Sequence, residues 1–238
     1  MIGIDRPGIE LSTWKKGYRL VDWPVGVAEF ADVLSLKSFG IVGASSGGPY
    51  ALACAHLIAD RLTGCAVVAG VSPLDVPHPE RFIVKTELQI VRLANRLPFV
   101  ARLAFRYFAW QFQRNPREGD GELPEEPAGL RQRDDVATGC EGESTGRVSR
   151  GSPPGCTRSH GQHRHRGRPW GFALEDVAMK VHIYQGELDS LVLPAAATYM
   201  AERLPNCELH WYPGQGHLGA IVNGAEDVIR MLAADKAP

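Results

Sequence analysis

One short run of small residues constrains this chain more than any other feature. Residues 39–42 read FGIV, an apolar run typical of a buried strand, and residues 43–48 read GASSGG. Pro49 then opens the alanine-rich run YALACA, which is typical of a helix with proline in its first turn. The stretch therefore predicts a strand, a sharp turn and a helix, the building unit of a parallel α/β sheet.

The turn matches the pattern G-x-S-x-G with Ser45 at its centre. In such a nucleophile elbow, a strained backbone lifts the serine hydroxyl above the end of the sheet. We expect strand and helix to pass so closely that a Cβ atom would collide at either Gly43 or Gly47. Ser46 is the alternative nucleophile, but only Ser45 has glycine at both flanking positions.

The same residues allow two other interpretations of the turn. One is a glycine-rich connection without a chemical role. The other is dinucleotide binding, because GASSG also occurs in short-chain dehydrogenases, where glycines let the backbone approach a pyrophosphate. Against this alternative, Pro49 stands where those enzymes carry their last glycine, and no tyrosine is followed four residues later by lysine. A P-loop is excluded because no Gly-Lys-Ser/Thr follows.

A serine nucleophile needs a base and an acid later in the chain, in the order serine, acid, histidine. Asp189 follows the strand-like run KVHIYQ at residues 180–185, and His217 follows the run ELHWY at residues 208–212. Because the carboxyl ends of parallel strands open on one side of a sheet, Ser45, Asp189 and His217 can converge there.

Other acids and histidines are weaker candidates for these roles. Asp75 follows the continuous apolar run at residues 63–71, a position that supplies the acid in some hydrolases, and Glu187 precedes Asp189. His182 and His210 alternate within strand patterns, so we expect them to face a helix or solvent.

On these motifs the chain resembles serine hydrolases of the α/β-hydrolase fold. It is similar to the branch reading D-R-P-G, G-x-S-x-G-G-P-Y-A-L-A-C-A, G-x-x-D and G-x-G-H, segments that begin here at residues 5, 43, 186 and 214. The resemblance implies a mostly parallel sheet flanked by helices, and a small-molecule ester or related acyl substrate. It also implies a Ser45, His217 and Asp189 triad acting through an acyl-enzyme, an oxyanion-hole donor at the backbone N–H of Ser46, and neither cofactor nor metal.

The beginning of the chain departs from that family. Family members start with three further strands, of which the third ends in a His-Gly loop that supplies a second oxyanion donor. Here residues 2–5, IGID, match the family's fourth strand. We therefore expect an N-terminally truncated hydrolase of impaired activity, with an inactive fragment as the alternative. We further expect residues 2–5 to pair beside the strand at residues 39–42. The alternative is that they lie off a sheet reduced to the strands that begin near residues 39, 63, 180 and 208.

The domain organisation follows from changes in composition. Residues 1–76 and 170–238 are expected to form the hydrolase core, with helices over residues 20–36, 193–204 and 225–234. Residues 77–130 are expected to form a helical lid inserted after the strand at residues 63–71. The first lid helix is predicted to present one apolar face, made of Ile90, Leu93, Ala94 and Leu97.

Residues 131–169 differ from the rest because they contain no Phe, Tyr, Trp, Ile, Leu or Met. Such a segment cannot bury enough apolar surface to offset its chain entropy, so we expect it to be disordered. Its Cys140 and Cys156 lack the C-x-x-C spacing of a zinc knuckle, so no metal site is predicted there.

The overall composition excludes several functional classes. The net charge of −1 over 238 residues gives no indication of a nucleic-acid or membrane partner. The N-terminus MIGIDRPG lacks the basic and apolar regions of a signal peptide, which favours a cytoplasmic location. Five cysteines is an odd number, and Cys54 and Cys65 lie in apolar runs, so we predict buried thiols and no disulfide framework.

Overall fold

The structure, a computed structural model, describes residues 1–7, 12, 13, 15, 17–97, 99, 100, 103 and 169–234. Most of the predicted lid and all but the last residue of the predicted disordered segment, with Cys140 and Cys156, lie outside these residues. Four strands form one sheet in the order β1-β2-β3-β4, and each neighbouring pair is parallel. They are β1 (Phe39–Ala44), β2 (Leu62–Val68), β3 (Val181–Gly186) and β4 (Cys207–Tyr212). The four strands expected around the serine turn are thereby confirmed.

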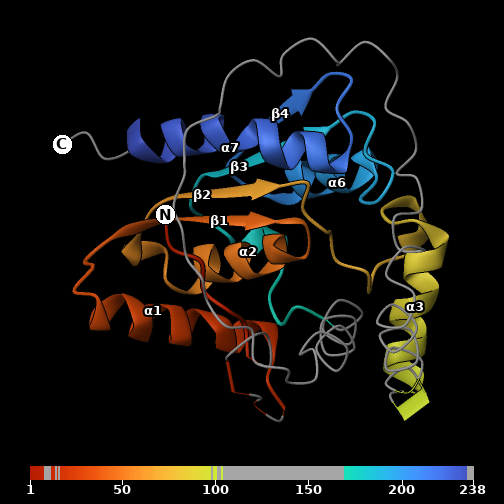
Figure 1. Ribbon diagram of the computed structural model, residues 1–238, viewed down its shortest axis with the longest axis horizontal. Helices are drawn as coiled ribbons and strands as arrows, with labels where there is room; N and C mark the ends of the chain where they lie inside the picture. The colour runs from red at the N-terminus through yellow and green to blue at the C-terminus, as the bar shows by residue number, and fades with distance from the viewer. Residues whose placement is uncertain are drawn as a thin grey trace, which may run out of the picture.

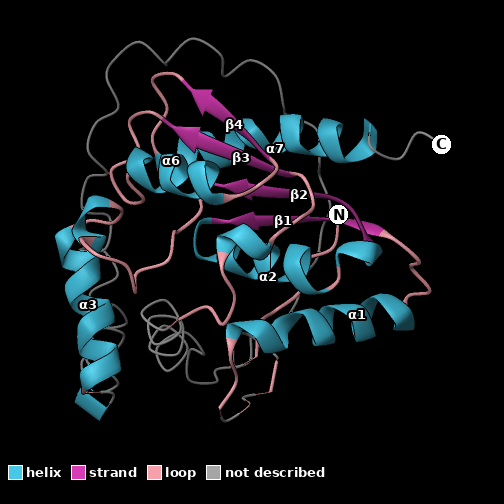
Figure 2. Cartoon of the chain, turned by 180° about the vertical axis from the view of Figure 1, so that it is seen from behind, coloured by secondary structure: helices cyan, strands magenta, loops and turns pink. Residues whose placement is uncertain are grey.

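Helices cover both faces of this sheet, as Figures 1 and 2 show from opposite sides. On one face lie α2 (Gly48–Leu57) and α6 (Pro194–Arg203), and on the other lies α7 (His217–Ala234). The apolar run of β2 is buried along most of its length because it is covered on both sides. Both helices predicted for the second half of the chain are present, although α7 begins at His217, earlier than expected.

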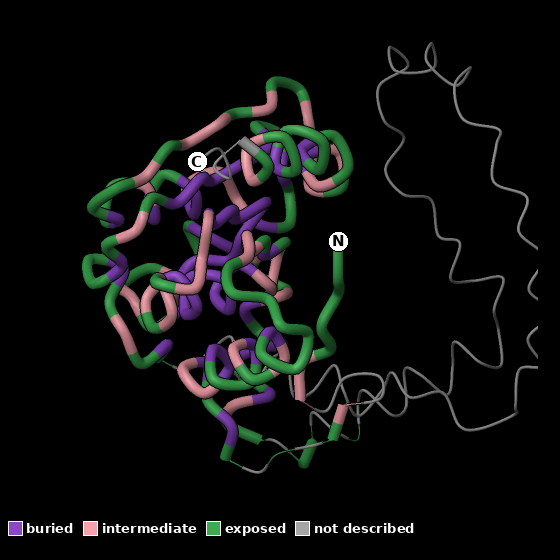
Figure 3. Tube along the Cα trace, turned by 90° about the vertical axis from the view of Figure 1, so that its left-hand side faces the viewer, coloured by how far each residue is buried: buried purple, intermediate pink, exposed green. Residues whose placement is uncertain are grey.

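The main core lies between the sheet and the helices α2 and α6. Its fully buried side chains include Leu52, Val67, Ile183 and Met200, and a smaller core around Tyr184 and Val228 lies under α7. Figure 3 shows these buried segments at the centre of the described chain. The buried thiols predicted at Cys54 and Cys65 are confirmed as members of the main core.

The helix α1 (Trp23–Val33) packs against the outside of α2. A short 3₁₀ turn precedes it, and the carboxylate of Asp22 accepts a hydrogen bond of 2.8 Å from the backbone N–H of Arg19. The ring of Trp23 meets that of Tyr50 edge to face, with centroids 5.7 Å apart. This aromatic contact fixes α1 beside the helix that follows the serine turn.

The helix α3 (Lys85–Arg96) lies beyond the carboxyl ends of the strands, where a lid is expected (Figure 1). The prediction of its apolar face was largely wrong. Its buried residues are Leu88, Val91 and Ala94. By contrast, Ile90, Leu93 and Leu97 are 36%, 37% and 54% exposed. The helix is turned this way because Leu88 and Val91 pack in one cluster with Phe82, Ile83 and Val192.

Residues 2–5 form no strand, so the prediction that they pair beside β1 was wrong. Within the described chain, β1 pairs with β2 alone. Ile2 and Ile4 remain 59% and 38% exposed, and Figure 3 shows this stretch along the outside of the molecule. The segment is held instead through a side chain, because the guanidinium of Arg6 donates to the carbonyl of Ser46 at 3.2 Å and lies over the ring of Tyr50.

Among the described helices, none combines the length and the apolar character needed to span a membrane.

Candidate active site

Ser45 occupies the first position of the turn that joins β1 to α2. Its φ of +49° places it in the left-handed region, which side-chain-bearing residues adopt at a cost in energy. Ser46 is not among the described residues with positive φ, so the strained position of the turn is the predicted nucleophile. The carbonyl of Ser45 accepts a hydrogen bond of 3.2 Å from the N–H of Val71, which ties the turn to the segment after β2.

The prediction that strand and helix leave no room for a Cβ atom is confirmed at Gly43 and wrong at Gly47. A Cβ atom on Gly43 would lie 2.4 Å from the carbonyl oxygen of Gly47, a contact with backbone that no side-chain movement relieves. A Cβ atom on Gly47 would meet nothing within 4 Å. The second tight position is Gly48, whose Cβ would lie 3.0 Å from Val67 and 3.1 Å from Gly70. The helix therefore approaches β2 through Gly48, one residue later than predicted.

His217 and Asp189 are brought together at the ends of β4 and β3. The Nδ1 atom of His217 lies 2.8 Å from Oδ2 of Asp189, and the side chains are 10% and 0% exposed. The loop carrying His217 packs onto the end of β3, because a Cβ atom on Gly186 would lie 2.4 Å from the carbonyl oxygen of Gln215. Glycine at position 186 therefore allows the contact between the two loops.

The buried carboxylate of Asp189 has four hydrogen-bonding partners. Its Oδ1 atom accepts from the N–H groups of Leu191 and Val192, both at 2.9 Å. Its Oδ2 atom, besides contacting His217, accepts from Nε2 of Gln185 at 3.0 Å. A buried charge requires such partners, and here they hold the carboxylate in a fixed orientation toward the imidazole.

Gln185 and Arg6 are two site residues that the sequence reasoning missed. Gln185 is fully buried on β3, and its amide also donates to the carbonyl of Val192 at 3.2 Å. The available signal was an amide side chain at the end of the apolar strand that precedes the acid. The available signal for Arg6 was its place in the D-R-P-G motif, although only the fold brings it to the carbonyl of Ser46.

The structure separates the other candidates from this pair. Among the described contacts, Asp189 is the carboxylate that meets His217, and neither Asp75 nor Glu187 shares a hydrogen bond with it. His182 and His210 lie within β3 and β4, before the strand ends, and contact each other at 3.2 Å. They therefore lie on the sheet, as the strand pattern predicted.

The serine, the acid and the histidine all follow carboxyl ends of parallel strands, namely β1, β3 and β4. All three residues therefore lie at the same end of the sheet, and β2 lies between β1 and β3. Cys54 and Cys207, two of the described cysteines, are not favoured as nucleophiles, because burial raises the pKa of Cys54 to about 12 and that of Cys207 to about 11. The arrangement provides a hydroxyl on a strained turn and an imidazole oriented by a buried carboxylate.

Comparisons with known proteins define the fold. No family model and no curated protein sequence matches this chain. An esterase from Thermogutta terrifontis matches with a TM-score of 0.54 and 17% identity, over 97% of this chain and 78% of that one. The esterase EaEST from Exiguobacterium antarcticum matches with a TM-score of 0.62 and 16% identity, over 99% of this chain and 81% of that one.

A third solved structure is the meta-cleavage product hydrolase CumD from Pseudomonas fluorescens IP01. It matches with a TM-score of 0.51 and 16% identity, over 95% of this chain and 75% of that one. Together with the parallel sheet flanked by helices, these likenesses show that the chain has the α/β-hydrolase fold.

Proposed function

We propose that this protein is a serine hydrolase that transfers an acyl group from an ester or related substrate to water. The observation that carries the proposal is the 2.8 Å contact between His217 Nδ1 and the buried carboxylate of Asp189. This contact lies at the carboxyl ends of the parallel strands, where Ser45 also follows β1. The positive φ of Ser45 supports its role as the nucleophile, because strain of this kind is found at nucleophile elbows.

Each residue has a defined role in the proposed reaction. The Oγ atom of Ser45 attacks the substrate carbonyl while Nε2 of His217 takes the hydroxyl proton. The imidazolium then gives this proton to the leaving alkoxide, and an acyl-enzyme remains on Ser45. A water molecule repeats the sequence, with His217 again as base, and releases the carboxylic acid and the free serine. Asp189 holds the imidazole in the tautomer that leaves Nε2 able to accept the proton.

The tetrahedral intermediates carry a negative oxygen that needs hydrogen-bond donors. The backbone N–H of Ser46, the residue after the nucleophile, is the proposed donor. The peptide group of this N–H is held through its own carbonyl, that of Ser45, which accepts a hydrogen bond of 3.2 Å from the N–H of Val71. The Arg6 guanidinium donates to the carbonyl of Ser46, in the next peptide group.

The substrate class is limited to acyl compounds by the chemistry of the proposed triad. Two structural neighbours are described as esterases and one as a meta-cleavage product hydrolase, so the fold alone does not select one substrate. Ester hydrolysis is the reaction we favour. A small-molecule substrate and a cytoplasmic location remain sequence-based predictions.

Hydrolysis of p-nitrophenyl acetate tests the proposal with a matched pair of variants. We expect Ser45→Ala to abolish turnover above the background rate, and Ser46→Ala to retain it because its backbone N–H remains. Retained turnover in Ser45→Ala with loss in Ser46→Ala would contradict the choice of nucleophile. No turnover in the wild-type protein would favour the inactive alternative, and a calorimetric titration showing NAD binding would favour the dehydrogenase-like one.

A further inference from the structure

A cluster of two histidines and one glutamate lies on the sheet face that α7 covers, apart from the proposed active site. His182 lies on β3, and Glu208 and His210 lie on β4. His182 and Glu208 are register partners on the neighbouring strands, and His210 follows Glu208 by two residues on the same face. The three side chains are brought together by the strand pairing itself.

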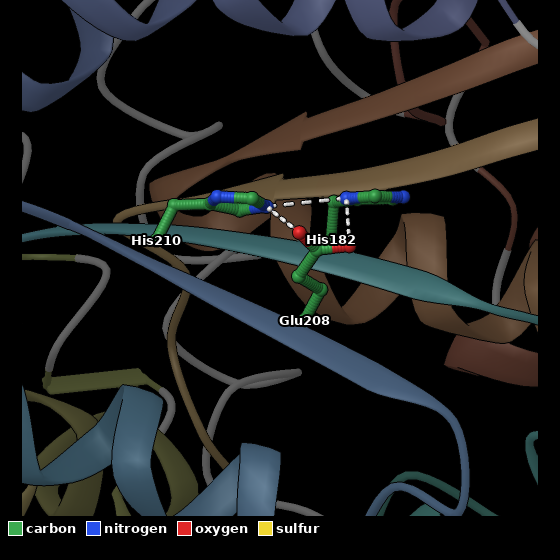
Figure 4. Close-up of side chains that lie close together, drawn as sticks. All are labelled: His182, Glu208 and His210. Carbon is green, nitrogen blue, oxygen red and sulfur yellow. Dashed lines mark hydrogen bonds and ion pairs between the residues drawn. The ribbon is translucent and has the colours of Figure 1, made fainter.

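The ligand-type atoms of these side chains point toward one another, as Figure 4 shows. Nδ1 of His182 lies 3.2 Å from Nε2 of His210. The carboxylate of Glu208 approaches both rings, with Oε2 at 3.7 Å from Nδ1 of His182 and Oε1 at 3.8 Å from Nε2 of His210. One ligand atom from each of the three side chains lies within 4.8 Å of the other two. Atoms bound to one tetrahedral Zn²⁺ at about 2.0–2.2 Å lie about 3.2–3.6 Å apart, so these separations are close to those of a zinc site.

We propose that His182, Glu208 and His210 form a binding site for one Zn²⁺ ion. The ligands are Nδ1 of His182, Nε2 of His210 and a carboxylate oxygen of Glu208, with a fourth position open to water. Two imidazole nitrogens and one carboxylate oxygen are a donor set that suits zinc. Among the described residues, this is the group of three such side chains whose ligand atoms converge.

The surroundings hold two of the ligands in place. The ring of His210 is stacked on that of Tyr184, with centroids 4.5 Å apart and planes at 14°. His182 is only 7% exposed, which limits its freedom. Such packing fixes the ring orientations before an ion binds, which reduces the ordering cost of binding.

Charged neighbours set the electrostatics of the site. The ammonium group of Lys180 lies 2.7 Å from Oε2 of Glu208 and orients the carboxylate. Oε1 is the oxygen that contacts His210. On α7, Asp227 accepts a hydrogen bond from Tyr212 at 2.7 Å and adds negative charge to this face.

Binding at this site would join β4 to β3. β4 is the last strand of the described sheet and pairs there with β3 alone. An ion that binds only the folded state would stabilise it by an amount that grows with the logarithm of the free ion concentration above Kd. The ligands lie at the second position of β3 and the second and fourth positions of β4, before the strand ends that carry Asp189 and His217. The proposed zinc site is therefore structural and independent of the proposed hydrolysis.

Titration of the full chain with Co²⁺, followed by visible absorption and by displacement with Zn²⁺, tests the proposal. Cysteine and histidine side chains of residues 131–169 are removed first so that they cannot contribute to the signal. The reference protein therefore carries Cys→Ser and His→Gln substitutions at Cys140, Cys156, His160, His163 and His165. In this reference protein we expect one Co²⁺ to bind. Adding Glu208→Gln or His210→Gln should weaken binding at least about tenfold, since each removes one of three protein ligands.

The matched control is Glu175→Gln. Glu175 is an exposed glutamate that pairs with Arg203 at 2.7 Å, much as Glu208 pairs with Lys180, but it lies outside the cluster. Its substitution should leave Co²⁺ affinity unchanged. The proposal is overturned if the reference protein binds no Co²⁺, or if Glu208→Gln and His210→Gln bind as well as the control. Circular dichroism of each variant shows whether the fold is retained. We expect it to be retained, because the side chains of Glu208 and His210 are 49% and 32% exposed.

Discussion

His217 and Asp189 lie 28 residues apart in the chain and meet at 2.8 Å between Nδ1 and Oδ2. The contact is formed where two neighbouring parallel strands end, and the acid is buried with further donors on both of its oxygens. A carboxylate so fixed determines the orientation and the tautomer of the imidazole.

Replacement of Asp189 by asparagine tests this relationship. The amide is nearly the same size, but it can stabilise the wrong imidazole tautomer, so we expect kcat for p-nitrophenyl acetate to fall by about 10³–10⁴-fold. Steady-state kinetics measure the effect, and circular dichroism checks the fold. A variant within threefold of the wild-type kcat would contradict the role of Asp189.

Gln185 provides a second test, because its amide positions the acid without reaching the substrate. Replacing it with methionine removes the 3.0 Å hydrogen bond to Asp189 and preserves most of the volume. We expect kcat to fall by about 10-fold, less than for Asp189→Asn, with little change in KM. A change in KM alone would assign Gln185 to the binding pocket instead. The variant also loses the hydrogen bonds from this amide to the carbonyls of Gly186 and Val192, so we expect the free energy of unfolding to fall by about 1–3 kcal/mol.

Substitution by alanine should destabilise the protein at Gly43 but have little effect at Gly47, although both glycines lie two residues from Ser45. Gly43→Ala would place a Cβ atom 2.4 Å from backbone, and we expect the free energy of unfolding to fall by about 2–4 kcal/mol. Gly47→Ala meets nothing within 4 Å and should change it by less than about 0.5 kcal/mol. Urea unfolding of the two variants measures both values. Equal losses would show that the turn does not have the described geometry.

Buried thiols should make the protein less stable in alkali. Burial raises the pKa of Cys54 to about 12 and also raises that of Cys65, whereas an unfolded thiol titrates near ~8.5. The unfolded chain therefore loses these protons first as the pH rises, so the free energy of unfolding decreases above about pH 8.5. Each thiol contributes a slope of up to about 1.4 kcal/mol per pH unit.

Cys54→Ala removes one of the two thiols and should flatten this dependence. Urea unfolding between pH 7.5 and about 10 measures the slope for both proteins, and the tyrosines, which titrate near ~10 in the unfolded chain, are the same in both. The alanine variant should be less stable at neutral pH, and the difference from wild type should narrow toward pH 10. Parallel curves would show that Cys54 is not held neutral by burial.

Sequence patterns predicted the strands and the meeting of Asp189 with His217, because the residues concerned form continuous motifs at the strand ends. The apolar runs before Ser45, Asp189 and His217 each became a strand of the parallel sheet. Because β3 and β4 are parallel neighbours, Asp189 and His217 lie at the same end of the sheet, as the order of the motifs indicated.

The errors have a common physical origin in tertiary packing. The buried face of α3 depends on a cluster with Phe82 and Val192, which no helical pattern contains. The segment at residues 2–5 was expected in the sheet, but Arg6 holds it at the carbonyl of Ser46. At the serine turn, Gly47 was expected to be the second position without room for a Cβ atom. This position is Gly48, because the start of α2 packs closely against Val67 and Gly70.

Labelling with a fluorophosphonate probe tests the central claim most directly, because this reagent forms a covalent bond with an activated serine. Intact mass spectrometry should show one adduct on the wild-type chain, and peptide mapping should place it on Ser45. The adduct should be lost in Ser45→Ala, retained in Ser46→Ala, and formed far more slowly in His217→Gln, which lacks the base. An adduct on another residue, or equal labelling of Ser45→Ala and the wild-type chain, would contradict the account.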